Sequence, residues 1–329
     1  MDLAGFRNAV YLRVVAPLVA VSPAWLAYGL ALIYADTRRS LDRARYREVS
    51  LCLEHVMGGR MSSRALEETA RDYFRNRACI RVDAMRLVGD GHNLTRLVAF
   101  RGEESVREAL ASGKGAVLCS AHYGSVRACG ALLGARGFPV TMITAWSLGE
   151  YRPKGMRRQR MYQFAWKPLE HHMRKPLDIR VARIGIAVAA SGILRRDELV
   201  FTLLDTAAPH GNQNAVTLDL LGGKTRVLPG PAVIAQLSGA PLFMVFLHRA
   251  ESWRHLVLEI GPRIDVSGDT TSAIRECMSE VERRVEQRPS EWEMWTMRRL
   301  FHIGLFPEDL AAEYYRMTNR RWGTPVTRG

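Results

Sequence analysis

Residues 113–125 read GKGAVLCSAHYGS, and this segment sets the architecture that we expect for the chain. Residues 116–120 form a short apolar run between glycines, which is typical of a strand buried on both faces. A helix is predicted over residues 126–135, and a second strand over residues 139–144 (PVTMIT). A strand, a helix and another strand in so short a segment make a βαβ unit, so the sequence predicts a parallel sheet.

The same alternation of short apolar runs and helical patterns continues along the chain. Before it, residues 51–77 are predicted to be helical and residues 106–112 to form a short helix, whereas residues 97–101 are ambiguous. The expected fold class is therefore α/β, with a mostly parallel central sheet flanked by helices and an N-terminal apolar helical anchor. The later predicted helices are 184–194, 231–238 and 274–285, and the later strands are 199–204, 215–220, 241–248 and 256–260.

The N-terminal region has a membrane-facing pattern. Residues 14–35 contain no charged side chain, and a bilayer-spanning helix needs about 20 such residues. Pro17 and Pro23 would kink such a helix. Residues 37–47 (TRRSLDRARYR) follow with five arginines, which places the bulk of the protein in the cytoplasm by the positive-inside tendency and would attract an anionic membrane surface. Two interpretations stay open: an inserted or interfacial anchor, or a helical hairpin buried in the domain.

These patterns divide the chain into three parts. We expect a membrane-associated helical segment with a basic flank over residues 1–50, an α/β domain over residues 51–310 and a C-terminal tail over residues 311–329. The five cysteines include no C-x-x-C pair, and His171–His172 lacks the spacing of an H-E-x-x-H zinc site, so we expect no metal.

The charge balance points to an acidic partner. The chain has 47 Lys+Arg against 33 Asp+Glu, a net charge of +14, and only five of these residues are lysines. Guanidinium groups suit phosphate and carboxylate, so a phospholipid, a phosphopantetheine carrier or a nucleic acid would fit. A nucleic-acid partner is not expected, because no known binding motif is present, aromatic residues make up 8%, and the basic runs flank apolar segments.

His122 is the first candidate for catalysis. It lies just past the carboxyl end of the predicted strand 116–120, where ligands gather in α/β sheets. A histidine at this place can act as a general base, and Gly124 would let a substrate or the turn approach closely. A purely structural histidine at a strand end is the alternative.

The residues around His122 resemble a known family. Segment 119–128 (CSAHYGSVRA) is similar to the first block, H-[FYLW]-G-N-[WF]-[DE], of the bacterial late (lauroyl- and myristoyl-type) lipid A acyltransferases. These enzymes and the related phosphatidylinositol mannoside acyltransferases belong to the lysophospholipid acyltransferase superfamily. The resemblance extends over nearly the whole chain. Its later blocks are similar to residues 203–205, 222–223, 228–241 (LPGPAVIAQLSGAP) and 289–299 (PSEWEMWTMRR).

The resemblance implies transfer of an acyl group from a thioester of acyl carrier protein or coenzyme A to a hydroxyl or amine of a lipid or lipid-like acceptor. The site would be at the cytoplasmic face of the bacterial inner membrane and would need no cofactor or metal. His122 would deprotonate the acceptor, and Asp205, which matches the third block, would be the second site residue; a turn-capping aspartate is the alternative. The candidate substrate-binding residues are Gly124, Ser125, Gly230 and, in a basic insertion, Arg158, Arg160 and Arg174.

One position departs from the family's motif. Arg127 stands where the family has Asp or Glu, and a guanidinium cannot accept the imidazole N–H and would oppose formation of the imidazolium. His122 then either pairs with another carboxylate, Asp205 or Glu150, or acts without one on an easier acceptor such as an amine in a specialised pathway, or the protein is inactive. Arg127 could also bind a phosphate or carboxylate of an altered substrate. Rebuilding the motif by Arg127→Glu would be expected to restore lipid acylation.

Overall fold

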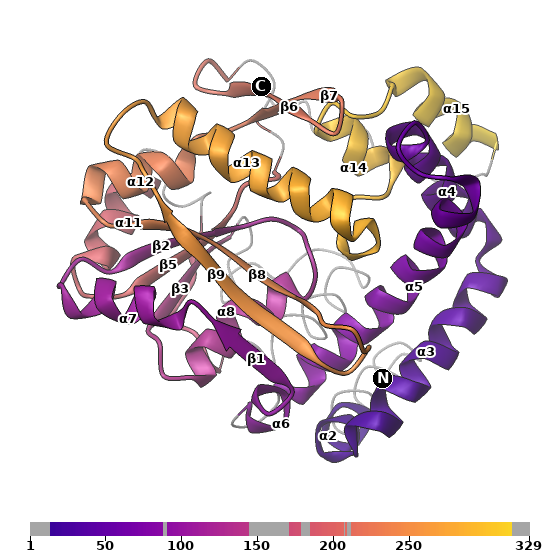
Figure 1. Ribbon diagram of the computed structural model, residues 1–329, viewed down its shortest axis with the longest axis horizontal. Coiled ribbons are helices and arrows are strands. Elements are labelled where there is room, and N and C mark those ends of the chain that lie inside the picture. Colours follow the sequence, from indigo (N-terminus) through magenta and orange to yellow (C-terminus); the bar gives the residue numbers. More distant parts are fainter. Residues whose placement is uncertain are drawn as a thin grey trace, which may run out of the picture.

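The core of the protein is a seven-stranded sheet (Figure 1). The computed structural model describes residues 14–87, 91–144, 171–178, 185–206, 208 and 212–317. The strands lie in the order β1-β9-β8-β2-β5-β3-β4, and every neighbouring pair is parallel except β8 and β9, so the predicted mostly parallel sheet is confirmed. The strands are β1 (Val98–Arg101), β2 (Ala116–Ser120), β3 (Val140–Thr144), β4 (Leu177–Asp178), β5 (Leu199–Leu203), β8 (Leu242–Arg249) and β9 (Leu256–Ile264).

Helices cover both faces of the sheet. The sequence of β2 is continuously apolar because its side chains are buried on both of these faces. All five of its residues are buried. Because side chains alternate along a strand, Val117 and Cys119 pack in one cluster while Ala116 and Leu118 pack in the other. The first cluster includes residues of α11 (Ile186–Leu194), α12 (Gly230–Ser238) and α13 (Thr270–Gln287), and the second includes residues of α7 (Glu103–Ala111) and α8 (Val126–Ala135).

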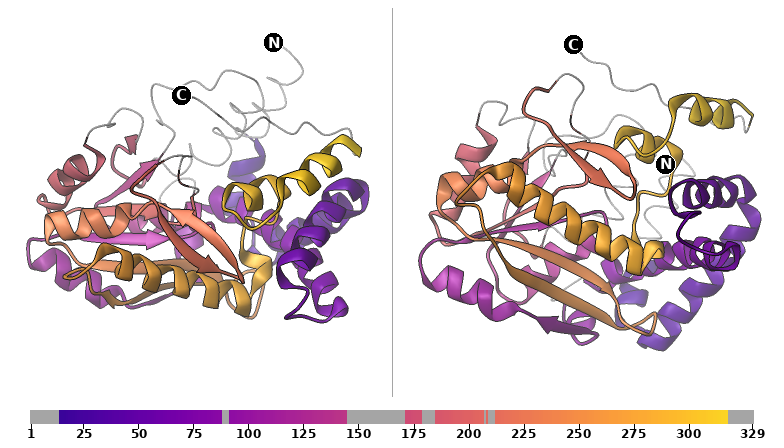
Figure 2. Two further views of the ribbon diagram at one scale, coloured as in Figure 1. Left: turned by 90° about the horizontal axis from the view of Figure 1, so that it is seen from above. Right: turned by 45° about the horizontal axis from the view of Figure 1, so that its top comes forward.

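Four helices of the N-terminal region stand at one end of the sheet (Figure 2). The predicted apolar segment breaks at Ser22 and Pro23, where no helical hydrogen bond can continue through the proline nitrogen. The predicted helix over 51–77 is instead two helices, and Ser62 caps the second by accepting the Ala65 N–H at 3.3 Å. These helices are α2 (Ala16–Val21), α3 (Ala24–Leu41), α4 (Arg43–Met57) and α5 (Ser63–Arg86).

Within the described parts of the chain, we find no helix with the length and apolar character that crossing a membrane requires. The expected anchor is therefore not confirmed as a span. Helix α3 instead packs on α5 through small side chains, with Ala27, Ala31 and Ala35 buried beside Tyr28.

The remaining elements complete the core at its C-terminal side. A separate hairpin is formed by β6 (Val216–Leu220) and β7 (Gly223–Val227), which pair antiparallel. The predicted boundary at residue 310 falls inside a helix, because α15 runs across it. The other elements are α6 (His92–Thr95), the 3₁₀ helix η2 (Pro289–Glu291), α14 (Met297–His302) and α15 (Glu308–Met317).

Candidate active site

The sheet register brings His122 and Asp205 together. Strands β2 and β5 are parallel neighbours with Ser120 opposite Leu203, so residues two positions past each strand end meet at the same edge. The His122 backbone N–H donates to both carboxylate oxygens of Asp205 at 2.9 Å, and Nδ1 of the ring lies 2.8 Å from Oδ1. Asp205 is thus the carboxylate paired with the imidazole.

The environment of Asp205 keeps it ionised. Its carboxylate is buried, and the Trp292 indole N–H donates to Oδ2 at 3.0 Å. Burial alone would raise the pKa of Asp205, but the His122 ring, the His122 N–H and the Trp292 N–H together lower that pKa below its usual value. An ionised carboxylate only accepts hydrogen bonds, so the Nδ1 of His122 must carry the proton.

Consequently Nε2 is the basic nitrogen of the neutral His122 ring. The side chain of His122 is 25% exposed, and Nε2 has no hydrogen-bond partner among the residues whose placement is described. An imidazole oriented by a buried carboxylate with its second nitrogen free is the arrangement that general-base catalysis needs.

A backbone strap holds the loop that carries His122. The His122 carbonyl accepts from the Glu293 N–H at 2.7 Å, and the Gly124 N–H donates to the Glu291 carbonyl at 2.9 Å. Gly124 has φ of +56°, and a Cβ at this position would lie 2.1 Å from the Leu247 carbonyl oxygen. The loop therefore requires glycine for its own conformation and packing, whatever else Gly124 contacts.

Arg127 forms an ion pair with Glu293 and not with Asp205, the partner of His122. It lies in the first turn of α8, and its Nη2 is 3.2 Å from Oε2 of Glu293. Arg77 of α5 also forms an ion pair with Glu293, and the Nη1 of Arg299 lies 2.6 Å from the Glu293 carbonyl oxygen and 3.6 Å from Oε2. Burial would raise the pKa of Glu293, but Arg127, Arg77, Arg299 and His122 hold that pKa far below its usual value.

Sequence reasoning missed Glu293 as part of the site. The only signal was its position inside the block 289–299, where two acidic residues alternate with tryptophans; nothing local ties it to His122 or Arg127. The Glu293 side chain is only 1% exposed, and this burial of a residue so far along the chain from His122 is a product of the fold.

The other predicted substrate-binding residues are distributed unevenly. Ser125 is buried and its Oγ hydrogen-bonds Asp83 of α5. Gly230 begins α12, whose opposite end leads into β8, so it lies at the same sheet edge as His122. Arg174 lies at the other edge, where its N–H donates to the carbonyl of Val140 at the start of β3. Arg158, Arg160 and the alternative partner Glu150 lie outside the described residues.

The model of the bacterial lipid A biosynthesis acyltransferase family matches residues 12–301. The chain belongs to this family. It is also 26% identical, over 209 residues, to a lipid A biosynthesis acyltransferase of Haemophilus influenzae; the match covers 63% of this chain and 60% of the relative's length.

Membership of the lipid A biosynthesis acyltransferase family makes position 127 informative. The resemblance read from residues 119–128 is confirmed at the level of the family, and the residue at position 127 is an arginine. In this family member the carboxylate beside the imidazole comes from the segment after β5, and Arg127 belongs to the Glu293 cluster.

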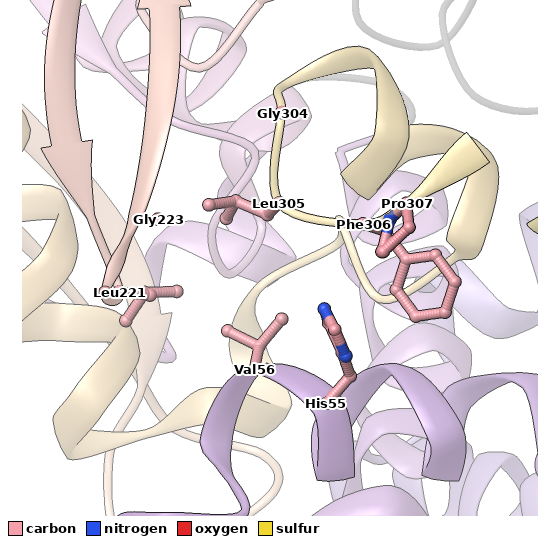
Figure 3. Close-up of a pocket in the computed structure, with 9 residues that line it drawn as sticks. His55, Val56, Leu221, Gly223, Gly304, Leu305, Phe306 and Pro307 are labelled. Carbon is pink, nitrogen blue, oxygen red and sulfur yellow. The ribbon is translucent and has the colours of Figure 1, made fainter. Parts of the chain in front are cut away.

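A pocket of about 350 Å³ lies away from these residues (Figure 3). It is lined by the end of α4, the turn between β6 and β7 and the connection from α14 to α15. The His55 ring contacts Phe306 with 4.8 Å between ring centroids. None of the predicted site residues lines this pocket, so we do not assign it to the family's chemistry.

Proposed function

We propose that the protein is an acyltransferase that moves an acyl group from a thioester of acyl carrier protein or coenzyme A to a hydroxyl or amine of a lipid acceptor, with His122 as general base. One observation carries the proposal: the 2.8 Å contact between Nδ1 of His122 and the buried carboxylate of Asp205. Family membership supports the reaction class.

The proposed reaction needs no covalent enzyme intermediate. Nε2 of His122 removes the proton of the acceptor as the acceptor atom attacks the thioester carbonyl carbon. The tetrahedral intermediate then collapses, the C–S bond breaks, and the imidazolium returns its proton to the leaving thiolate. Asp205 stabilises the imidazolium while it exists and keeps the ring in the productive tautomer.

The surface of α2 and α3 supports a membrane location on the cytoplasmic side of the inner membrane. These helices bury alanines and Tyr28 against the protein and expose large apolar residues to solvent, and Trp25 is 63% exposed. Arg38 and Arg39 lie in the last turn of α3, beside this apolar stripe. An apolar stripe next to basic residues fits an interfacial helix on an anionic membrane. The exposed large apolar residues of α2, α3 and the two residues before α2 are Val14, Val15, Leu18, Val21, Trp25, Leu26, Leu30, Ile33, Tyr34 and Leu41.

A non-lipid acceptor is the second candidate. The observation that favours it is Arg127, which gives the site a cation where the family's first block has an acid. The intact contact between His122 and Asp205 argues against the third possibility, an inactive relative.

The test uses the purified full chain with lauroyl-acyl carrier protein or lauroyl-coenzyme A and a bacterial lipid extract. Thiol release and acylated products are followed by mass spectrometry, alongside lipid and soluble extracts of cells with and without the protein. We expect transfer by the wild type, loss of transfer in His122→Ala, and unchanged transfer in His255→Ala, whose side chain is exposed on the turn between β8 and β9. Wild-type rates in His122→Ala would exclude this histidine as the base, and a new acylated species found only in the soluble extract would favour the second candidate.

Membrane binding is tested separately by flotation with phosphatidylcholine vesicles that contain or lack phosphatidylglycerol. Replacing Trp25 and Leu30 with serine is expected to abolish flotation, whereas replacing the exposed Val188 and Leu237, on α11 and α12, is expected to leave it intact. Equal flotation of both double variants would contradict an interfacial role for α2 and α3.

A further inference from the structure

Three arginines converge on one buried carboxylate beside the proposed base. Arg77, Arg127 and Arg299 come from α5, α8 and α14, and all three contact Glu293. Three guanidinium charges against one carboxylate leave a local charge of +2. The cluster is therefore not a neutral ion pair, and its charge is not balanced by its own members.

This cluster is attached directly to the His122 loop. The backbone N–H of Glu293 donates to the His122 carbonyl at 2.7 Å, and Arg127 lies five residues after His122. A group bound by these arginines would therefore lie beside the loop that carries the imidazole.

The guanidinium groups keep both donors and access to solvent. The side chains of Arg127, Arg77 and Arg299 are 20%, 28% and 37% exposed, and each guanidinium has five N–H donors, more than the contacts to Glu293 use. Glu293 would raise the pKa of Arg127, but burial and the charges of Arg77, Arg299 and Arg81 outweigh it and lower that pKa. The cluster thus carries more positive than negative charge, and binding an anion would relieve the repulsion among its arginines.

We propose that Arg77, Arg127 and Arg299, positioned by Glu293, form a phosphate-binding site for the acceptor. The inference rests on the proposed function and adds to it that the acceptor carries a phosphate near the group that His122 deprotonates. A phosphate monoester has a charge of about −1.5 to −2 and three acceptor oxygens, which matches the charge and the donors of the cluster better than a carboxylate does. In this proposal the arginine at position 127 supplies a side chain that binds phosphate, while Asp205 orients the imidazole.

The test measures binding of inorganic phosphate to the full chain by isothermal titration calorimetry at constant ionic strength. We expect Arg127→Gln and the more exposed Arg299→Gln each to weaken binding at least tenfold, and Arg127→Lys to retain part of the affinity because it keeps the charge. Arg136→Gln is the matched control, since Arg136 caps the other end of α8, pairs with Glu103 and is 37% exposed. Wild-type affinity in both Gln variants, or an equal loss in the control, would overturn the proposal.

Two further measurements separate this proposal from the catalytic one and identify the source of the phosphate. His122→Ala is expected to bind phosphate like the wild type, so loss of transfer without loss of binding leaves the site intact even if catalysis is reassigned. Dihexanoyl-phosphatidic acid that binds at least tenfold more tightly than inorganic phosphate would indicate a lipid headgroup, and equal affinity would indicate a soluble phosphate; both support the site. Arg127-dependent binding of coenzyme A without binding of either probe would assign the arginines to the donor and overturn the assignment to the acceptor.

Discussion

The guanidinium of Arg127 lies 3.2 Å from Oε2 of Glu293, a residue 166 positions further along the chain. At the same time the imidazole of His122 is paired with Asp205, 83 positions away. His122 and Arg127 therefore pair with different carboxylates: Asp205 orients the proposed base, and Glu293 binds Arg127. The arginine at position 127 therefore does not prevent the imidazole of His122 from pairing with a carboxylate.

Arg127→Glu is expected to fail to restore the family's motif. It would place a second carboxylate beside the buried Glu293 and remove one of its cations, at a cost on the order of 2–4 kcal/mol in the free energy of unfolding. This reverses the expectation from the motif alone. Urea unfolding and transfer assays check it, with Arg136→Glu as the half-exposed control. A variant with wild-type stability and increased lipid acylation would contradict the geometry.

Asp205→Asn is expected to lower kcat by about 10²–10⁴-fold, because an amide does not stabilise the imidazolium as a carboxylate does. The lowered pKa of Asp205 also means that this carboxylate stabilises the fold at pH values above its unfolded pKa and that this contribution is lost as the pH falls through its folded pKa. The acid limb of unfolding should therefore weaken in the variant. Steady-state kinetics and acid titration of unfolding measure both effects. Asp219→Asn, at an exposed residue of β6, should change neither.

Glu291→Gln is expected to stabilise the protein more at pH 8 than at pH 5. Burial raises the pKa of Glu291 from 4.5 to about 7. The hydrogen bond from the Arg249 backbone N–H and the positive charges of Arg249 and Arg288 lower this pKa but do not outweigh burial. The protonated form is thus favoured in the fold, and its contribution is present below the unfolded pKa and lost as pH rises through about 7. One unit of pKa shift corresponds to ~1.4 kcal/mol, so the free energy of unfolding of the variant relative to the wild type should grow by up to ~3 kcal/mol between pH 5 and pH 8.

Denaturant unfolding at several pH values measures this difference. Glu280→Gln should show the opposite sign, because the hydrogen bonds of Arg283 and Arg284 lower the pKa of Glu280 although burial would raise it. A pH-independent difference between wild type and Glu291→Gln would show that folding does not raise the pKa of Glu291.

Gly124→Ala is expected to destabilise the fold by more than ~3 kcal/mol and to abolish transfer, because the new Cβ would meet the Leu247 carbonyl and the residue would keep a positive φ. Gly137→Ala is a close control. Its φ is +87°, but no atom lies within 4 Å of its added Cβ, so only the backbone cost of ~1 kcal/mol is expected. The stabilities of the two variants are compared by thermal unfolding. Equal losses of stability would contradict the role of close packing at Gly124.

Much of the fold could be predicted from local patterns. The strand at 116–120 and the helix at 126–135 lie where expected, because burial on both faces leaves a continuous apolar run and glycines mark where each element ends. The helix predicted over 51–77 was wrong as a single element. The first helix is capped at its C-terminal end by Gly58, which is followed by Gly59, and Ser62 caps the second helix, so the local signals for this break were present in the sequence.

The amino-acid sequence by itself determined the α/β class, the family's blocks and the place of His122 at the end of a buried strand, since each depends on the order of neighbouring residues. Only the tertiary structure decided which carboxylate meets which cation. The pairs His122–Asp205 and Arg127–Glu293 join residues on separate elements, and their contact depends on the order and register of the strands and on the segment that follows α13. Local patterning specifies which face of an element is buried, but not the distant partner that this face will contact.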